Sequence, residues 1–321
     1  MTPPPADAPQ GSESLAESVR RTLDAAPQRW LSPKWLYDDL GSVLFDAITH
    51  VPHYYPTSRE RAILEARSAD VARLSEADTL VELGSGTSEK TRLLLDAFTA
   101  TGQLRRFCPL DVSAATLAAA AEAIRAEHPG IEVVAVEGDF LHDLDRIPTG
   151  GTRLVAFLGG TIGNLTPPEQ ARFVGAVAAT LAPGDGLLLG TDLVKDVDRL
   201  LTAYDDPIGV TAAFDRNVLQ VLNRELGADF DLARWRHEAR WDAEEERIEM
   251  HLVATEAQVV RVPGAGLELK VEEGESIQTE ISSKFRVERL PALLEPAGFE
   301  VVEVWTDPDD DLALTLARIP R

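Results

Sequence analysis

The stretch TLVELGSGTSEKT, residues 79–91, decides the fold. Its first five residues form a short apolar run with a β-branched valine, which is typical of a buried strand. Gly84 and Gly86 then allow the backbone to turn sharply. Thr87 or Ser88 is a candidate N-cap for a helix that follows. Strand, glycine turn and helix together predict the opening unit of a nucleotide-binding α/β domain.

The same rhythm of strand and helix continues along the chain. We expect further strands at residues 106–110, 131–136, 154–158 and 187–189. Strands that alternate with helices predict a parallel sheet with helices on both faces. The expected fold class is therefore α/β, with a doubly wound parallel sheet whose ligands bind beyond the carboxyl ends of its strands.

A different pattern follows this repeat. Residues 197–226 have a helical pattern, and beyond Phe230 apolar and polar residues alternate, as in antiparallel strands. Two strand-like runs, 300–305 and 312–317, predict a hairpin at the end of the chain. These changes predict a disordered segment at 1–14, a nucleotide-binding domain made of 60–196 plus 286–321, and a smaller α+β domain made of 15–59 plus 197–285.

Composition and charge limit the partners. The 31 basic and 54 acidic residues give a net charge of −23, which repels nucleic acids and anionic membranes. A small, neutral or zwitterionic substrate fits this charge. The charge also fits a monomer, although the sequence does not determine the oligomeric state. Cys108 alone cannot form an internal disulfide, and the sequence lacks a membrane-length apolar run and a signal-peptide pattern. We therefore expect a cytoplasmic protein. The spacing of the histidines predicts no metal.

Candidate nucleotide-binding residues follow the predicted strands. Asp111 could accept hydrogen bonds from ribose hydroxyls, and it could also cap the helix that begins near Ser113. Asp139 could accept from an adenine amine while the ring of Phe140 supports the base, although a solvated loop aspartate fits the pattern equally well. Lys90, at the start of its helix, could pair with a ligand carboxylate or simply be exposed.

Candidate substrate residues lie outside the nucleotide-binding half. All of the tyrosines fall there: Tyr37, Tyr54, Tyr55 and Tyr204. Phenol hydroxyls can bind a carboxylate and aromatic faces can stabilise a quaternary ammonium, but tyrosines also fill partly wet cores.

One predicted strand carries a second group of polar candidates. Alternation puts Ile277, Thr279 and Ile281 on one face, and places Glu280 and Ser282 together on the other. A carboxylate beside a hydroxyl could hold a ring that offers N–H donors. An exposed strand face is the alternative, and the pattern alone favours it. The acidic runs 244–246 and 309–311 are expected to be solvated.

Eight short motifs occur in order along nearly the whole chain: 33–38, 54–57, 82–91, 157–164, 190–195, 203–205, 214–217 and 280–285. Together they resemble the histidine-specific, S-adenosylmethionine (SAM)-dependent methyltransferases of ergothioneine biosynthesis. The resemblance implies a class I methyltransferase fold, SAM as the methyl donor, and transfer of three methyl groups to the α-amino nitrogen of L-histidine, which gives hercynine.

The resemblance also implies roles for individual residues. SAM contacts are implied at Gly84, Ser85, Lys90, Asp111, Asp139 and Phe140. Histidine contacts are implied at Tyr54, Asn164, Tyr204, Met250, Glu280, Ile281 and Ser282. Among these, Tyr54 and Tyr204 would hold the carboxylate, and Glu280 with Ser282 would bind the imidazole. Tyr37 and Asn164 would lie near the reacting amine as catalytic residues.

Two other functions remain open at the level of sequence. One is SAM-dependent methylation of another amino acid or small amine. The other, from a different class, is a non-catalytic nucleotide-binding Rossmann protein. Glu89 stands where a dinucleotide site requires its third glycine, which argues against NAD. Methyl transfer needs a neutral amine aimed at the methyl group, so positioning can supply most of the acceleration without a strong base.

Overall fold

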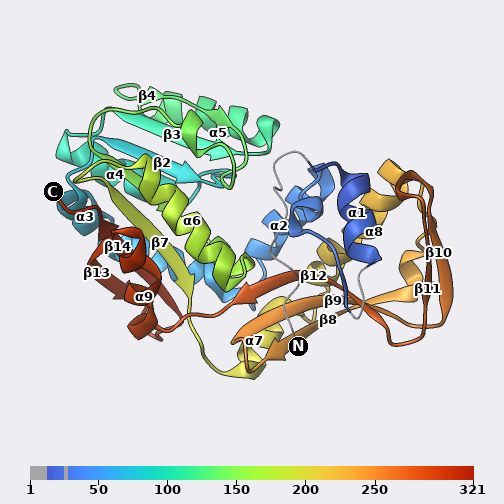
Figure 1. Ribbon diagram of the computed structural model, residues 1–321. Helices are drawn as coiled ribbons and strands as arrows, with labels where there is room; N and C mark the ends of the chain where they lie inside the picture. The colour runs from blue at the N-terminus through green and yellow to red at the C-terminus, as the bar shows by residue number, and fades with distance from the viewer. Residues whose placement is uncertain (1–12, 25–27) are drawn as a thin grey trace. The chain divides into compact units, whose positions relative to one another are not determined.

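The computed structural model describes residues 13–24 and 28–321, and the chain divides into two compact units (Figure 1). The first unit contains Pro56–Val194 and Phe285–Arg321. The second contains the described residues up to Tyr55 and Lys195–Lys284. Residues 1–12 of the segment expected to be disordered lie outside the described residues. Within the described part, no helix is both long and apolar enough to cross a membrane.

The first unit is built on a mostly parallel sheet. Its strands run in the order β13-β14-β7-β6-β2-β3-β4, and β5 also pairs with β3. Their bounds are β2 (Thr79–Leu83), β3 (Arg106–Asp111), β4 (Glu132–Val133), β5 (Val136–Glu137), β6 (Arg153–Phe157), β7 (Gly186–Asp192), β13 (Glu300–Thr306) and β14 (Leu312–Arg318). β14 pairs antiparallel with β7 and with β13, so the C-terminal hairpin extends the sheet at one edge. This topology confirms the expected α/β class.

The third predicted strand is interrupted, and a proline in its neighbour explains why. β4 pairs with the start of β3 and β5 pairs with its end. The amide of Val134 donates to the carbonyl of Phe107. Residues 107, 109 and 111 of β3 therefore direct their main-chain hydrogen-bonding groups toward β4 and β5. Residue 109 is a proline and has no N–H to donate. The ladder therefore breaks between β4 and β5.

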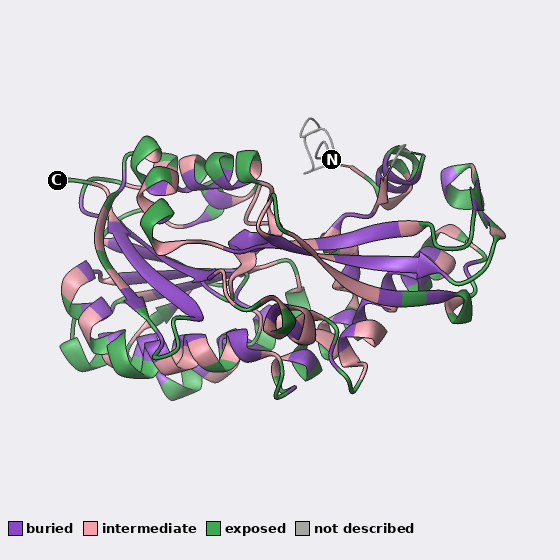
Figure 2. Cartoon of the chain, turned by 90° about the horizontal axis from the view of Figure 1, so that it is seen from below, coloured by how far each residue is buried: buried purple, intermediate pink, exposed green. Residues whose placement is uncertain are grey.

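Helices cover both faces of this sheet. α3 (Tyr55–Ser75), α4 (Thr91–Thr101) and α5 (Ala114–Glu127) pack on one face, and α6 (Pro167–Thr180) and α9 (Leu290–Leu294) on the other. Successive strand residues point to opposite faces, so Leu80 enters the first core and Val81 the second. Figure 2 shows that burial concentrates in the strands, while the helices turn exposed faces outward. The residue at the N-cap of α4 is Lys90, not Thr87 or Ser88 as expected.

The second unit combines helices with antiparallel strands. Its helices are α1 (Leu15–Leu23), α2 (Asp39–Thr49), α7 (Val197–Tyr204) and α8 (Val210–Leu226). Its strands are β1 (Arg29–Trp30), β8 (Trp235–Asp242), β9 (Arg247–Ala254), β10 (Gln258–Val262), β11 (Leu267–Val271) and β12 (Ser276–Ser283). One sheet has the order β1-β12-β9-β8, and β10 and β11 form a separate hairpin.

The helix expected over 197–226 is two helices in the structure. Pro207 cannot continue a helix from α7, because it lacks the required N–H. The carboxylate of Asp206 instead accepts hydrogen bonds from main-chain amides at the start of α8, including those of Gly209 at 2.8 Å and Thr211 at 2.7 Å. Asp206 therefore fixes the turn that separates α7 from α8.

A β-bulge in β12 decides which side chains face the core. Ile277 pairs with Leu252 and Glu280 pairs with Met250, so Thr279 is an extra residue in the strand. Directly paired residues share a face, and Ile277 and Glu280 therefore both face inward with β9. The simple alternation expected for this strand is wrong across the bulge, because the period of two holds only where no residue is inserted.

A buried ion pair holds β6 beside the turn that precedes β7. The guanidinium of Arg153 lies 2.8 Å from the carboxylate of Asp185, and both side chains are almost fully buried. Replacing Arg153 by leucine should lower the free energy of unfolding by about 3–5 kcal/mol, since Asp185 would stay buried without its partner. Urea titration measures this change.

A second pair in the same sheet provides the control. Arg106 contacts the exposed Glu132 at 2.8 Å, and exposed pairs of this kind contribute about 0–1 kcal/mol. Arg106→Leu should therefore have little effect on the free energy of unfolding. Equal losses from the two substitutions would contradict the importance of burial for the pair of Arg153 and Asp185.

Candidate functional site

The glycine turn after β2 lies beneath an aromatic ring. Gly84 has a φ of +64°, and a Cβ added there would lie 3.8 Å from the ring of Phe140. That ring packs against Phe157 and Phe173, with centroid distances of 5.1 and 5.8 Å. The sequence-predicted residues Gly84 and Phe140 therefore lie together, and the position of the ring is fixed by its aromatic neighbours.

Asp111, at the end of β3, contacts the same turn. One carboxylate oxygen accepts from the amide of Gly86 at 2.8 Å and the other from the amide of Ser113 at 2.9 Å. Asp111 therefore contacts the start of α5, which is the structural role that the sequence also allowed. An ionised carboxylate has about four acceptor sites, so each oxygen can still accept from another donor.

Asp139 lies on the loop after β5, next to Phe140. It is half-buried, and its carboxylate accepts from the amide of Leu141 at 2.8 Å. This contact fixes the loop and leaves acceptor capacity on the carboxylate.

Lys90 forms an ion pair that the sequence did not predict. Its ammonium contacts the carboxylate of Glu60, which is fully buried and also accepts from the amide of Gly159 at 2.7 Å. A Cβ at Gly190 would lie only 2.3 Å from the same carboxylate. Glu60 thus links α3 to the start of α4 and to the turn after β6, and Lys90 is not simply an exposed lysine.

Two further side chains mark this region of the first unit. The hydroxyl of Ser85 is buried and has no hydrogen-bond partner among the described residues. Glu82 lies beneath the turn and accepts from the hydroxyls of Ser88 and Thr91. Burial raises the pKa of Glu82 to about 7, against the effect of these hydrogen bonds. The unpartnered Ser85 hydroxyl fits a polar ligand, because a buried donor without an acceptor is costly.

The inner face of the β12 sheet carries the second group of candidates. Glu280 faces inward opposite Met250, and Ser282 faces inward opposite Ile248. Glu280 is 9% exposed and Ser282 is 5% exposed, so the expected exposed strand face is wrong. Ile281 pairs with Glu249, which places its side chain on the opposite face of the sheet from Glu280 and Ser282.

Aromatic rings cluster in the same unit. Tyr37 contacts Phe45 and Phe214, with centroid distances of 5.5 and 5.3 Å. Tyr54 contacts Phe45 at 6.5 Å and Tyr204 at 6.0 Å, in both cases edge to face. Three of the tyrosines predicted as candidates therefore lie in one continuous cluster.

The fourth tyrosine and the hydroxyl of Tyr204 have defined polar partners. Tyr55 accepts a hydrogen bond from the ammonium of Lys195 at 2.8 Å. Tyr204 lies 2.8 Å from the hydroxyl of Ser282, and both hydroxyls accept from the ammonium of Lys284, at 2.9 and 2.7 Å. These contacts link α7 to the inner face of β12.

Burial controls the ionisation of Glu280 and Tyr37. It raises the pKa of Glu280 to about 8, with a further rise from the nearby Asp215 and an opposing effect from Lys284. Burial also raises the pKa of the Tyr37 phenol well above its usual value, and the charges of Glu280 and of Tyr54 add to this effect. At neutral pH both groups therefore hold their protons.

Asp215 and His237 form a buried pair behind Tyr204. The Nδ1 atom of His237 lies 2.7 Å from the carboxylate of Asp215, and Nε2 donates to the main-chain carbonyl of Tyr204 at 2.8 Å. Burial alone lowers the pKa of His237, but the hydrogen bond and charge of Asp215 outweigh it, so the pKa is raised. Sequence spacing gives no signal for this pair, which joins α8 to β8.

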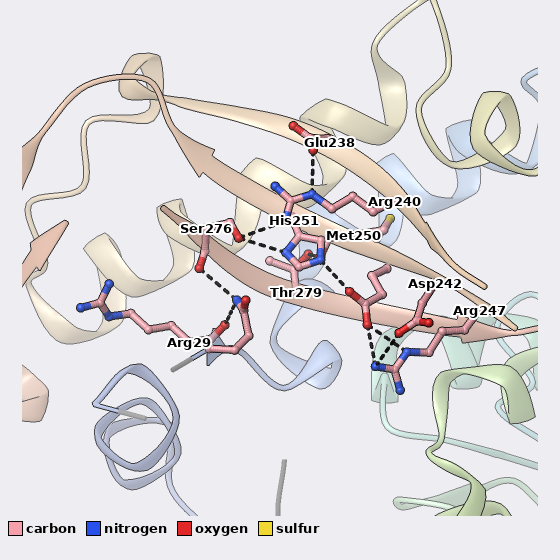
Figure 3. Close-up of polar contacts among 11 residues, drawn as sticks. Arg29, Glu238, Arg240, Asp242, Arg247, Met250, His251, Ser276 and Thr279 are labelled. Atoms are coloured by element: carbon pink, nitrogen blue, oxygen red, sulfur yellow. Dashed lines mark hydrogen bonds and ion pairs between the residues drawn. The ribbon is translucent and has the colours of Figure 1, made fainter. Parts of the chain in front are cut away.

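The opposite face of the sheet has its own polar network (Figure 3). His251 contacts Glu249 at 3.0 Å and Ser276 at 3.3 Å, and Arg247 lies 2.9 Å from Glu249. Burial opposes the ionisation of Glu249, yet His251 and Arg247 together lower its pKa to about 2. Each of these groups is satisfied by its neighbours, so the network stabilises the sheet.

The acidic turn between β13 and β14 is more buried than expected. Asp307, Asp309 and Asp311 place one carboxylate oxygen each within 4.8 Å of one another, and Asp307 and Asp311 are buried. The expectation that all of 309–311 is solvated is therefore wrong for Asp311. Arg59 contacts Asp311 at 3.0 Å and Asp309 at 2.5 Å and balances much of this charge.

The predicted site residues divide between the units. The first unit holds the candidates for the donor, and also Asn164, at the end of a 3₁₀ turn (Thr161–Asn164) after β6. The second unit holds Tyr37, Tyr54, Tyr204, Met250, Glu280 and Ser282. The two residues proposed to lie near the amine, Tyr37 and Asn164, thus belong to different units.

The raised pKa of Glu280 predicts that the free energy of unfolding depends on pH. In the unfolded chain the carboxyl ionises near 4.5, whereas in the folded protein it keeps its proton up to about 8. Stability from this group is therefore present at low pH and is lost as the pH rises through that window. Relative to Glu280→Gln, the wild type should lose on the order of 2–4 kcal/mol between pH 5 and pH 8.

Urea unfolding of both proteins at several pH values measures this difference. Glu273→Gln, at an exposed position in the same unit, is the matched control and should follow the wild type at every pH. Parallel curves for the wild type and Glu280→Gln would show that Glu280 ionises normally in the folded protein.

Comparison with known proteins identifies the family. A family model described as histidine-specific methyltransferase, SAM-dependent, matches residues 15–319. A histidine N-alpha-methyltransferase of Mycolicibacterium smegmatis is 57% identical over 310 residues, which cover 97% of this chain and 96% of that protein. The protein of the same name from Mycobacterium tuberculosis is 55% identical over 307 residues, 96% of this chain and 95% of that protein.

A more distant relative has a larger architecture. An ergothioneine biosynthesis protein 1 of Schizosaccharomyces pombe is 32% identical over 242 residues, which cover 72% of this chain and 30% of that protein. The family model and the two mycobacterial relatives each span nearly the whole chain. This chain therefore belongs to the family of histidine-specific, SAM-dependent methyltransferases.

Proposed function

We propose that this protein transfers methyl groups from SAM to the α-amino nitrogen of L-histidine, and that three transfers give hercynine for ergothioneine biosynthesis. Family membership supports the reaction and the donor. The observation that carries the substrate assignment is the inward-facing pair of Glu280 and Ser282, because a buried carboxyl and a hydroxyl side by side suit a ring with N–H groups.

The first unit holds the donor in this proposal. The carboxylate of Asp111 has acceptor capacity for the ribose hydroxyls, and the buried hydroxyl of Ser85 offers an unused donor. Phe140 would support the adenine, and Asp139 would accept a hydrogen bond from its amine. Lys90 binds the carboxylate of the donor while Glu60 holds its ammonium in place. Bound SAM supplies an electrophilic methyl group.

The second unit binds the amino acid. The hydroxyls of Tyr54 and Tyr204 donate to the carboxylate, and Met250 lines the space around the ring. Glu280 and Ser282 bind the imidazole. Because Glu280 keeps its proton up to about pH 8, it can donate to a neutral ring or pass the proton to it and form an ion pair.

The amine is positioned for attack, and no strong base takes part. The side-chain carbonyl of Asn164 accepts one amine hydrogen and so directs the nitrogen lone pair. The family resemblance assigns the phenol of Tyr37 to the same amine, and this phenol stays protonated because its pKa is raised. Positioning of this kind can supply several kcal/mol of the barrier reduction.

Methylation of a different amino acid or small amine is the alternative within the enzyme class. A ligand without ring N–H groups would leave Glu280 buried and unpaired, which disfavours it. The cytoplasmic location, the monomeric state and the absence of a metal stay predictions from the sequence.

A panel of amino acids incubated with SAM tests the substrate. Mass spectrometry should find trimethylated product from histidine. Glu280→Ala should lower kcat/KM for histidine by on the order of a hundredfold, while the affinity for SAM stays unchanged. Glu273→Ala is the exposed control and should behave as the wild type. Preference of the wild type for an amino acid without an imidazole would overturn the assignment.

Asp111→Ala tests the donor site. Loss of the carboxylate should weaken binding of S-adenosylhomocysteine by on the order of tenfold to a hundredfold, since hydrogen bonds from two hydroxyls to a charged acceptor are removed. Isothermal titration calorimetry measures this affinity. The exposed Asp309→Ala, in the same unit, should leave it unchanged. Unaltered binding to Asp111→Ala would exclude a direct contact.

A further inference from the structure

Glu60 is a buried carboxylate whose two oxygens have different partners. It lies on α3, and its side chain has no exposed area. Oε1 accepts from the main-chain amide of Gly159 at 2.7 Å, and Oε2 contacts the ammonium of Lys90. Both partners are donors, so one side chain must supply two acceptors. A carboxylate does so, whereas the isosteric amide of glutamine has one acceptor and one donor.

Gly159 begins the loop that carries Asn164. Gly159 and Gly160 both have a positive φ, of +78° and +68°. Glycine adopts this conformation easily, and it also leaves the backbone free to adopt others. The 3₁₀ turn Thr161–Asn164 follows directly. The hydrogen bond from the Gly159 amide to Glu60 therefore fixes the loop at its most adaptable point, just before the turn that ends at Asn164.

Gly190, on β7, leaves space for the same oxygen. A Cβ at position 190 would lie 2.3 Å from Oε1 of Glu60, the atom that accepts from Gly159. Residues 60, 90, 159, 164 and 190 all belong to the first unit. A single carboxylate thus ties the donor lysine to the loop of Asn164, and the strand beside it is shaped to admit its oxygen.

We propose that Glu60 is a positioning residue for methyl transfer, which holds the loop of Asn164 in a fixed place relative to Lys90. This inference rests on the roles proposed above for Lys90 at the donor and for Asn164 at the amine. Glu60 acts through these two residues and not by contact with either ligand. Its main effect therefore falls on the rate of transfer, since a displacement of about 1 Å in a reacting group can cost about a hundredfold.

A purely structural role for Glu60 makes a different prediction. A carboxylate that only stabilises the fold would affect donor binding and transfer together, and its loss would add to the loss of Asn164. A carboxylate that acts through Asn164 has little left to position once the Asn164 amide is gone. Single and double variants therefore distinguish the two roles.

Glu60→Gln is the first test. A charge-assisted hydrogen bond is the stronger one, so the glutamine oxygen should face Lys90 and its NH₂ should face the Gly159 amide. The rate of the first methyl transfer, measured in a single turnover with saturating SAM and histidine, should fall by about tenfold to a hundredfold. The affinity for S-adenosylhomocysteine, measured by calorimetry, should change by less than about threefold. Glu65→Gln, at an exposed position on α3, is the control and should change neither.

Gly190→Ala tests the same contact from the other side. Its methyl group should displace Oε1 of Glu60 and leave the oxygen that contacts Lys90 in place. The variant should therefore reproduce the slow transfer and the retained donor affinity of Glu60→Gln. Gly175→Ala is the matched control, because a Cβ there meets no atom within 4 Å.

The double variant Glu60→Gln/Asn164→Ala decides the route. In the background of Asn164→Ala, Glu60→Gln should slow transfer by less than about threefold further. Losses that multiply, an unchanged rate in Glu60→Gln, or a fall in donor affinity as large as the fall in rate would each overturn the proposal. Circular dichroism reports folding. If Glu60→Gln does not fold, Gly190→Ala alone and combined with Asn164→Ala carries the test.

Failure of the proposed amine site gives a separate result. If Asn164→Ala transfers the methyl group at the wild-type rate, the role of Asn164 is wrong, and the role of Glu60 fails with it. If Asn164→Ala slows transfer and Glu60→Gln does not, only the role of Glu60 is wrong.

Discussion

The inserted residue in β12 is the constraint on which the candidate substrate site depends. Thr279 shifts the register by one, and the side chain of Glu280 therefore faces the core opposite Met250. A strand without the insertion would place Ile277 and Glu280 on different faces. Bulges are frequent next to functional sites because they redirect a side chain at low cost to the sheet. Here the redirected group is a carboxyl.

Burial of that carboxyl shapes its surroundings. Removed from water, Glu280 favours its neutral form, and neighbouring phenols and the pair of Asp215 and His237 complete a polar inner face. Lys284 adds a positive charge from the end of the same strand. A neutral carboxyl and an ammonium thus lie within a few residues of a single bulge.

Local patterns predicted the first unit well, because its elements depend on nearby residues. The strand and glycine turn at 79–91, and the proline that begins α6, are visible in the sequence. Long-range contacts were not visible: Glu60 on α3 meets Lys90 at the start of α4, and His237 on β8 meets Asp215 on α8. The bulge at Thr279 was missed because the residues around it alternate as in a regular strand. The position of Lys284 could have been predicted from the sequence, because it follows Glu280 and Ser282 at the same spacing of two residues.

The buried carboxylate of Glu60 has a consequence for how this family can vary. Its oxygen occupies the space that a side chain at position 190 would fill, 2.3 Å from the Cβ of any other residue there. Positions 60 and 190 are therefore sterically coupled, although they lie far apart in the sequence. Homologues that replace the glycine should have lost the acid, so the two columns of an alignment should change together.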